Sequence, residues 1–507
     1  MQSKNTRTGA TSIPPSVLAL LLAAAGGAVA LYGVALMSDD AGWMNLLNAS
    51  LPALLGGTCL WAGYRLVRKQ PAAVWAPLPW FLAAWTAYYG FGPLAYVYGT
   101  PETVAYMDAF YPVNDRGLLR TNLLNVVGLV TVLLGAALVS RLRFDFAQPM
   151  TGSPGHDPWR VAVLFLVIGV PIKYLLELPY VLGLVDFVLP GSIQYLGTFS
   201  GLAILPLTVA AAEGRRGART LLWTLVASEM LAGFVMLAKL HIITTVLLVF
   251  LGQYAVRPDL KRLVVTGILI GVGYVAVLSP FVDFARVFLG RASAQDLAEA
   301  SAVAGSYGSE GRETLADVRP GVQGWWSRLA YPNAQAFAMD QYDQGKAGWT
   351  FGMAGYVFVP RFLYDDKPIM TPGREFNYLV QGTDTSSTGL GFFVGEAYWN
   401  GGWPLVILTG LFVGGLFAVL GRISARAVRS GRWLYVPLVF MTIYLGLRPD
   451  DWFVPLYLGG VMQVVLVVIL LNLTLSALVL RRGKRPSDGR QTPSHMAAGV
   501  PAADAQR

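Results

Sequence analysis

The chain is dominated by apolar segments of the length that crosses a membrane. Most of them approach the roughly 20 residues that a helix needs to span a hydrocarbon core. We predict about twelve transmembrane helices and therefore an all-α integral membrane protein. The predicted spans are Pro15–Met37, Met44–Val67, Pro77–Val97, Leu118–Val139, Val161–Leu182, Tyr195–Ala212, Leu221–Leu237, Ile242–Tyr254, Leu263–Phe284, Gly402–Leu420, Leu434–Leu447 and Val454–Leu480.

Basic residues in the short connections predict the orientation of these spans. The basic connections are separated from one another by even numbers of predicted spans, so they share one face, which the positive-inside rule assigns to the cytoplasm together with both termini. The net charge of +9 then reflects topology and contact with anionic lipid headgroups rather than nucleic-acid binding. These connections are Lys4 with Arg7, Tyr64–Lys69, Arg141–Arg143, Gly214–Arg219, Arg257–Arg262, Gly421–Arg432 and Arg481–Arg485.

One long polar segment interrupts the series and defines the predicted domains. Residues 1–286 form an N-terminal transmembrane bundle, 287–391 an outer loop, 392–482 the C-terminal transmembrane helices and 483–507 a disordered cytoplasmic tail. The first span is longer than a typical signal-peptide core, so we expect it to be retained. The single cysteine, Cys59, falls inside a span and leaves no disulfide for the outer loops.

The pattern of the outer segment predicts a lid that contains short helices. Ser293–Ala304 has the pattern of a short helix, and Gly305–Gly311 is expected to be a hinge. Gly324–Tyr342 carries an apolar stripe with aromatic residues typical of a helix in the membrane interface, and Phe351–Leu363 predicts another short apolar helix.

The order of motifs in this region resembles the Wzy-type oligosaccharide repeat-unit polymerases. The resemblance is carried by SRLAY (327–331), FVPRFLYDDKP (358–368) and GFFVGEAYWNGGWPLV (391–406), the last of which departs from the family pattern at Gly401-Gly402. It implies a broadly GT-C-like glycosyltransferase with a large periplasmic loop, in a bacterial inner membrane. It further implies undecaprenyl-diphosphate-linked oligosaccharides as substrates, no cofactor, and a chain-length regulator protein as a partner.

Such an enzyme must bind a diphosphate leaving group, for which arginine and lysine are suited. Basic residues on the outer side are informative because the positive-inside rule disfavours them there. Snorkelling or pairing with Asp365 and Asp366 is the alternative for Arg361 and Lys367. A polar turn is the structural alternative for Arg448–Trp452. The candidate substrate-binding cations are Lys239, Arg328, Arg361, Lys367, Arg374 and Arg448.

Two residues are candidates for the catalytic base. Glu396 stands where the loop enters a span, where a carboxylate serves either catalysis or a helix cap. His241 is, of the three histidines, the one assigned to the outer side. Tyr398 and Asn400 join the candidate substrate-binding residues, with an interface anchor and a helix cap as their structural alternatives.

Other ionisable residues receive structural interpretations. Lys173 and Glu177, one turn apart inside a span, are expected to neutralise each other, whereas Glu229 has no partner visible in the sequence. The three histidines and single cysteine do not fit a zinc site, and the sequence predicts no metal centre.

The predicted function is polymerisation of lipid-linked repeat units at the outer face of the membrane. A ligase that passes the glycan to another acceptor is one alternative. A polyprenyl-phosphosugar transferase using Asp39 or Asp40 is a second. A flippase or transporter is a third, although the long single loop and the lack of visible repeats disfavour it.

Overall fold

The computed structural model describes residues 13–142, 155–185, 189, 191–289, 297–309, 321–359, 364, 366–368, 370–383 and 387–475. All regular structure in these ranges is helical, which confirms the all-α prediction. Ten of the described helical segments are long and apolar enough to cross a membrane. They are Pro15–Ser38, Ala41–Lys69, Asp115–Arg141, Pro158–Val181, Ile193–Ala212, Ala218–Val235, Lys239–Val256, Leu260–Arg286, Phe393–Arg429 and Phe453–Leu471.

The two remaining predicted spans are also helical, but one is interrupted and the other is short. Residues 77–98 form α3 (Pro77–Trp85), a π-helical turn η2 (Thr86–Phe91), a 3₁₀ turn and α4 (Ala95–Tyr98). The interruption coincides with a close approach to α2 (Ala41–Lys69), where a Cβ on Gly90 would lie 2.8 Å from Gly56 Cα. The short span is α22 (Val436–Leu447).

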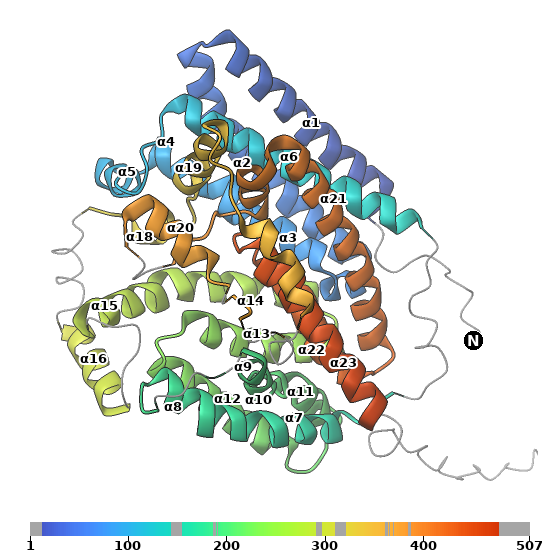
Figure 1. Cartoon of the computed structure of the whole chain (residues 1–507). Helices are drawn as coiled ribbons and strands as arrows, with labels where there is room; N and C mark the ends of the chain where they lie inside the picture. The colour runs from blue at the N-terminus through green and yellow to red at the C-terminus, as the bar shows by residue number, and fades with distance from the viewer. Residues whose placement is uncertain are drawn as a thin grey trace, which may run out of the picture.

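A first group of helices surrounds α6 (Asp115–Arg141), which packs along α21 (Phe393–Arg429) and α1 (Pro15–Ser38) (Figure 1). Glycines allow the α6 and α21 backbones to approach closely. A Cβ on Gly135 would lie 2.2 Å from the carbonyl oxygen of Leu411, and one on Gly414 would lie 2.0 Å from that of Val132. Small residues at a crossing are the usual route to tight packing between membrane helices.

The start of α21 departs from the prediction. The helix begins at Phe393 rather than at Gly402, and residues Gly401 and Gly402 form a kink inside it, with φ +62° at Gly402. The glycine pair, which suggested a helix start, is instead a bend. The polar residues before it are helical because they pack against neighbouring segments.

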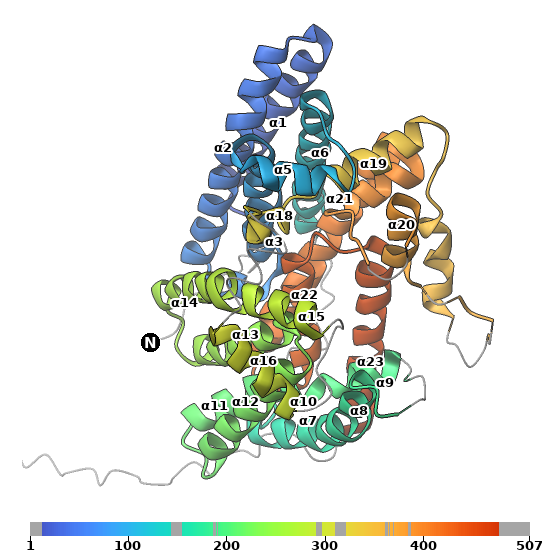
Figure 2. The ribbon, with the colours of Figure 1, turned by 90° about the vertical axis from the view of Figure 1, so that its left-hand side faces the viewer.

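A second group runs from α7 to α15 and crosses the first group at a steep angle (Figure 2). It meets the first group where α10 packs against α22. Its main members are α7 (Pro158–Ile172), the π-helical turn η5 (Lys173–Glu177), α8 (Leu178–Val181), α9 (Gly191–Gly197), α10 (Phe199–Leu202), α11 (Ile204–Ala212), α12 (Ala218–Val235), α13 (Lys239–Val256), α14 (Leu260–Gly273) and α15 (Ser279–Leu289).

Contacts between connections agree with the two faces predicted from the basic residues. On the basic face, defined by the ends that carry the basic connections, the pairs are Arg422 Nη1 to Leu142 O (3.1 Å), His156 N to Gly431 O (2.9 Å) and Tyr254 Oη to Pro71 O (3.2 Å). On the opposite face they are Arg116–Asp39 (2.5 Å), Thr100 Oγ1 to Gly321 O (2.8 Å) and Tyr111 Oη to Asp340 (2.7 Å). Each pair therefore joins connections assigned to the same face.

The long segment on the opposite face is helical in several short pieces: α16 (Leu297–Ser309), α18 (Gly324–Ser327), α19 (Pro332–Asp343), the 3₁₀ helix η7 (Thr350–Phe358) and α20 (Pro372–Gln381). The hinge predicted for Gly305–Gly311 is wrong over Gly305–Ser309, because α16 continues to Ser309, and the rest of it lies outside the described residues. Helix α19 packs on α21 and α6, where Gln335 and Asn125 exchange two side-chain hydrogen bonds. The stripe predicted for the interface thus packs partly against protein.

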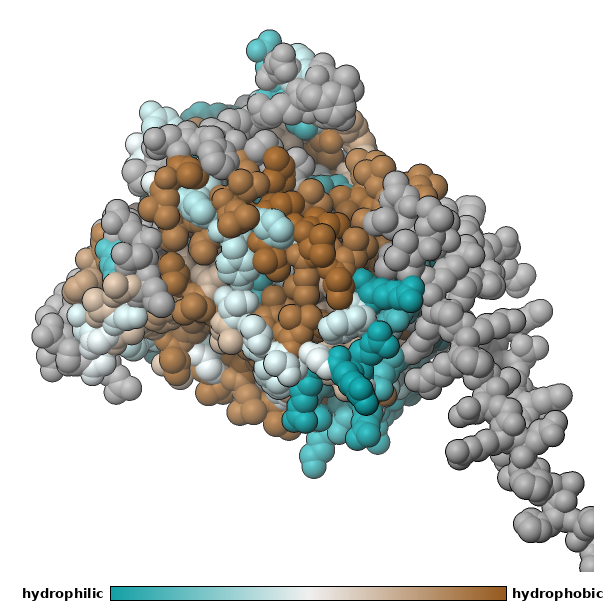
Figure 3. Space-filling view, turned by 90° about the horizontal axis from the view of Figure 1, so that it is seen from below, coloured by the Kyte–Doolittle hydropathy of each residue, from teal (hydrophilic) through white to brown (hydrophobic). Residues whose placement is uncertain are grey.

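The second group of helices presents apolar side chains away from the rest of the protein. Figure 3 shows a largely hydrophobic face with hydrophilic residues gathered along one edge. On α14, Ile268 is 60% exposed and Leu269 65% exposed. Apolar side chains presented outward in this way are expected of helices that face lipid.

Candidate functional site

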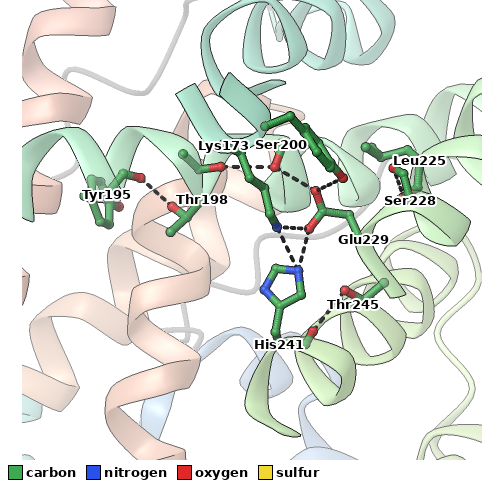
Figure 4. Close-up of polar contacts among 11 residues, drawn as sticks. Lys173, Tyr195, Thr198, Ser200, Leu225, Ser228, Glu229, His241 and Thr245 are labelled. Carbon is green, nitrogen blue, oxygen red and sulfur yellow. Dashed lines mark hydrogen bonds and ion pairs between the residues drawn. The ribbon is translucent and has the colours of Figure 1, made fainter. Parts of the chain in front are cut away.

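A buried polar cluster lies inside the second group of helices (Figure 4). Lys173 Nζ donates to Glu229 Oε2 at 2.5 Å, and His241 Nε2 lies 2.8 Å from the same oxygen and 2.7 Å from Lys173 Nζ. Ser200 Oγ donates to Glu229 Oε1 at 2.7 Å, and the Tyr174 hydroxyl lies 3.4 Å from that oxygen. We call these five residues the Glu229 cluster. Glu229 is fully buried, whereas the His241 side chain is 25% exposed.

The cluster forms because α12 and α13 are joined by a tight turn. Leu237 adopts a left-handed conformation with φ +50°, and its N–H donates to the carbonyl of Phe234. Gly233 lets the first turn of α13 pack on α12, since a Cβ there would lie 3.0 Å from His241 Cδ2. The turn and the glycine together bring His241 to Glu229. Strained backbone of this kind is concentrated at functional sites.

The predicted Lys173–Glu177 pair is wrong for the folded protein, because Lys173 pairs with Glu229. Lys173 and Glu177 are the first and last residues of a π-helical turn, η5 (Lys173–Glu177). A π-helix has more residues per turn than an α-helix, so residues four apart are no longer aligned side by side. Glu177 instead faces Gly197, where a Cβ would lie 2.3 Å from its Oε2. Glu229, for which the sequence suggested no partner, is the centre of the cluster.

A second cluster lies at the start of α13 and on α15, on the face opposite the basic face. Asp283 Oδ1 accepts from Lys239 Nζ at 2.9 Å and from Arg328 Nη2 at 2.6 Å. Arg286 is exposed, lies within electrostatic range of Lys239 and donates to the carbonyl of Leu237 at 3.3 Å. We call Lys239, Asp283, Arg286 and Arg328 the Asp283 cluster. Counted over the described residues, the cluster holds three cations and one carboxylate, and the Arg328 side chain remains 41% exposed.

A third polar group, the Arg448 corner, connects α22 to the following helix. Arg448 Nε pairs with Asp450 Oδ1 at 3.0 Å and its Nη2 with Asp451 Oδ2 at 3.1 Å, while Nη1 donates to the Tyr444 hydroxyl. Tyr331 Oη lies 3.4 Å from Asp450 Oδ2. Burial raises the pKa of Asp450 above its usual range, although Arg448 opposes the shift. With two acids on its guanidinium, Arg448 has the geometry of the polar turn, the structural alternative for this segment.

Glu396 is wholly buried in the first turn of α21. Its Oε2 accepts a hydrogen bond of 2.5 Å from the backbone N–H of Phe453, where the membrane helix after α22 begins. This geometry favours the helix-capping alternative. A catalytic role for Glu396 stays a prediction.

Tyr398 and Asn400 hold the long segment against α21. The Tyr398 hydroxyl donates to Asp343 at 3.0 Å, and Asn400 Nδ2 donates to Thr350 Oγ1 at 2.9 Å. Asp343 also pairs with Arg120, which reaches Asp340 at 3.0 Å. These contacts join α21 to the long segment, and the interface anchor and the helix cap stay predictions for Tyr398 and Asn400.

The other predicted cations that the structure describes, Lys367 and Arg374, are not brought into the Asp283 cluster. Arg361 lies outside the described residues, as does Asp365. Lys367 donates to the carbonyl of Val359 at 2.9 Å, and Arg374 is exposed on α20. The structure thus groups Lys239 with Arg328, and places His241 on the same first turn of α13.

Sequence reasoning missed Asp283, Arg286 and the ion pairs of Arg120. Asp283 is next to the last residue of the predicted span Leu263–Phe284, and Arg286 lies just beyond it. Both charges were therefore interpreted as marking the end of that span. Their three-residue spacing and their place on the outer side were available signals. The partner of Glu229 was not accessible from the sequence, because it depends on how three helices rotate against one another.

The chain was compared with models of protein families, with curated proteins and with solved structures, and nothing matched in any of the three comparisons. The geometry of the clusters therefore carries the functional argument.

Proposed function

We propose that the chain is a glycosyltransferase that moves a growing glycan from a polyprenyl diphosphate to a sugar hydroxyl of a second lipid-linked repeat unit. The reaction takes place on the face opposite the basic face, in a bacterial inner membrane whose cytoplasmic side is the basic face. The observation that carries this proposal is the Asp283 cluster, in which Lys239, Arg286 and Arg328 outnumber one carboxylate. The resemblance of residues 327–406 to repeat-unit polymerases points the same way.

The excess positive charge suits a diphosphate. The positive-inside rule disfavours cations on this face, so their grouping here calls for a negative partner. A diphosphate carries about two to three negative charges and forms charge-assisted hydrogen bonds with guanidinium and ammonium groups. Arg286 and Arg328 are exposed enough to meet a ligand, while Asp283 holds Arg328 beside Lys239.

His241 supplies the base in this proposal. Its Nδ1 has no hydrogen-bond partner among the described residues, and its Nε2 faces Glu229. The proposed role requires the tautomer that donates Nε2–H to Glu229, which leaves Nδ1 as an acceptor and lets the carboxylate orient the ring. In this tautomer the Lys173 ammonium, 2.7 Å from Nε2, directs its N–H groups to Glu229 and not to the ring. Glu229 is therefore a positioning residue.

The transfer itself balances as a single displacement. The acceptor hydroxyl oxygen bonds to the anomeric carbon, the bond from that carbon to the diphosphate oxygen breaks, and the hydroxyl proton passes to His241 Nδ1. The diphosphate leaves with the electron pair and is held by Lys239, Arg286 and Arg328. In an inverting displacement the base and the group that holds the leaving diphosphate lie on opposite sides of the reacting carbon. The proposal therefore requires the acceptor to approach from the side of His241 and the diphosphate to lie on the side of Lys239.

A null strain of the source organism, complemented with variants, tests the proposal. Loss of a polymerase leaves single repeat units on the acceptor, loss of a ligase leaves none, and loss of a flippase leaves units facing the cytoplasm. We expect the first pattern in the null strain and with His241→Ala, whose turnover should fall about 10²–10⁴-fold at normal protein level. The matched control Arg116→Gln, an exposed arginine paired with Asp39 on the same face, should restore polymer length. Full-length polymer with His241→Ala would contradict the role of His241 as the base. A null strain with either of the other two patterns would contradict the proposed polymerase activity.

A further inference from the structure

A basic cavity lies on the face away from the proposed reaction. It has a volume of about 600 Å³ and opens between the ends of α11, α12, α13 and α14. Arg219, Arg257 and Arg262 line it, together with one acid, Asp259. Asp259 is already engaged, because its Oδ1 accepts from the backbone N–H of Arg262 and caps α14. The cavity therefore presents three guanidinium groups with one opposing charge.

The wall of the same cavity is apolar. Leu222, Phe250 and Leu263 line it, and Trp223 at its edge is 53% exposed. Beyond the edge, the outward side of α14 continues as an exposed apolar surface that includes Val264 and Val265. A basic rim above an apolar wall matches a molecule with an anionic head and a hydrocarbon tail. Free phosphate would use the rim and leave the wall and Trp223 unexplained.

We propose that this cavity binds the headgroup and upper acyl chains of an anionic phospholipid. The phosphate lies among Arg219, Arg257 and Arg262, where guanidinium groups form bidentate hydrogen bonds. The positive end of the α14 macrodipole adds to the attraction. The acyl chains follow the apolar wall toward the exposed side of α14, and Trp223 sits at headgroup depth. The site is separate from the proposed glycan chemistry and does not depend on it.

A second cavity supports a lipid at this place. It has a volume of about 720 Å³, lies on the other side of the α13–α14 connection and is lined by Arg68, Lys261 and the apolar residues Leu260 and Val264. The connection Arg257–Leu260 thus separates two basic cavities that both border apolar surface.

Native mass spectrometry of the full chain in detergent, titrated with phosphatidylglycerol or phosphatidylcholine, tests the proposal. We expect retention of phosphatidylglycerol over phosphatidylcholine by the unmodified chain. The triple variant Arg219→Gln, Arg257→Gln, Arg262→Gln should lose about 100-fold in affinity for phosphatidylglycerol. The matched control Arg141→Gln, Arg215→Gln, Arg216→Gln removes the same charge from exposed positions on the same face that do not line the cavity, and should bind as the unmodified chain does.

Three results would overturn the site. Equal loss in both triple variants would mean general attraction to a basic face. Equal retention of the two lipids by the unmodified chain would mean that the arginines do not select an anionic head. Displacement of phosphatidylglycerol by millimolar inorganic phosphate would identify a phosphate site instead of a lipid site. Should the cavity variant fail to fold, the single variant Arg257→Gln, at an exposed position, gives the same comparison against Arg216→Gln.

Discussion

The Glu229 carboxylate neutralises the charge of a buried lysine, Lys173. It is fully buried, and the Lys173 side chain opposite it is 3% exposed. A buried ion pair contributes little net stability relative to apolar residues, yet removal of one partner leaves an uncompensated charge in a medium that solvates it poorly. The pair is therefore replaceable as a unit and not one residue at a time.

This asymmetry gives the first prediction. Glu229→Gln should lower the free energy of unfolding by about 3–5 kcal/mol, because Lys173 then lacks its counter-charge. The double variant Lys173→Met, Glu229→Gln should recover most of that loss, measured by thermal unfolding in detergent. A double variant no more stable than the single one would contradict the pairing. Turnover should stay low in both variants, since each lacks the group that orients His241.

The second prediction separates capping from catalysis at Glu396. Glu396→Ala leaves the buried N–H of Phe453 without its acceptor, which should cost about 1–3 kcal/mol of stability. Glu396→Gln keeps an acceptor oxygen and should cost less. We expect less folded protein with Glu396→Ala, while turnover per folded molecule stays near normal with Glu396→Gln. A turnover loss of about 10²-fold with Glu396→Gln at normal protein level would restore its role as the base.

At the scale of elements, the helix packing rests on specific glycines. Gly233 is the one that concerns the site, because a Cβ there would lie 2.8 Å from Ile242 Cγ1 as well as close to the His241 ring. Gly271 on α14 has nothing within 4 Å of the equivalent position. The two helical glycines therefore differ in surroundings and provide a matched pair.

The third prediction uses that pair. Gly233→Ala should push the first turn of α13 away from α12 and misplace His241, lowering polymer synthesis in cells about 10-fold or more. Gly271→Ala should be neutral or slightly stabilising, since alanine favours a helix over glycine by about 1 kcal/mol. Equal activity of the two variants would show that the α12–α13 contact does not position the histidine.

The sequence predicted elements better than contacts, and the reason is physical. Span positions follow from apolar length alone, so every predicted span overlaps described helix, the last of them as far as Leu475. The start of α21 was misplaced because Glu396 and Asn400 are polar, and their burial depends on partners elsewhere in the chain. The Glu229 cluster depends likewise on helix rotation. The sequence assigned Lys239 and Arg328 to the same face, but it did not predict that they share a carboxylate.

At the scale of the whole molecule, the two faces provide the fourth prediction. A reporter fused after Gly311 should be active only outside the cytoplasm and one fused after Arg485 only inside, as the basic connections require. A reporter inserted at the Arg215–Gly217 turn should behave like the one at Arg485. The opposite result at any of these sites would exchange the two faces and place the Asp283 cluster in the cytoplasm.

The Lys173–Glu229 pair also has a consequence for how the chain is made. The partners are 56 residues apart, so Lys173 reaches the membrane before Glu229 has been synthesised. At about 5–20 residues per second the delay is about 3–11 seconds. During that interval Glu177 is the acid nearest in sequence, and before the π-helical turn is fixed by its neighbours the two can pair on an ordinary α-helix. The Lys173–Glu177 pair, which is absent from the folded protein, can thus form in the nascent chain. We therefore expect Glu177→Gln to slow insertion of α7 and to change the stability of the folded protein little.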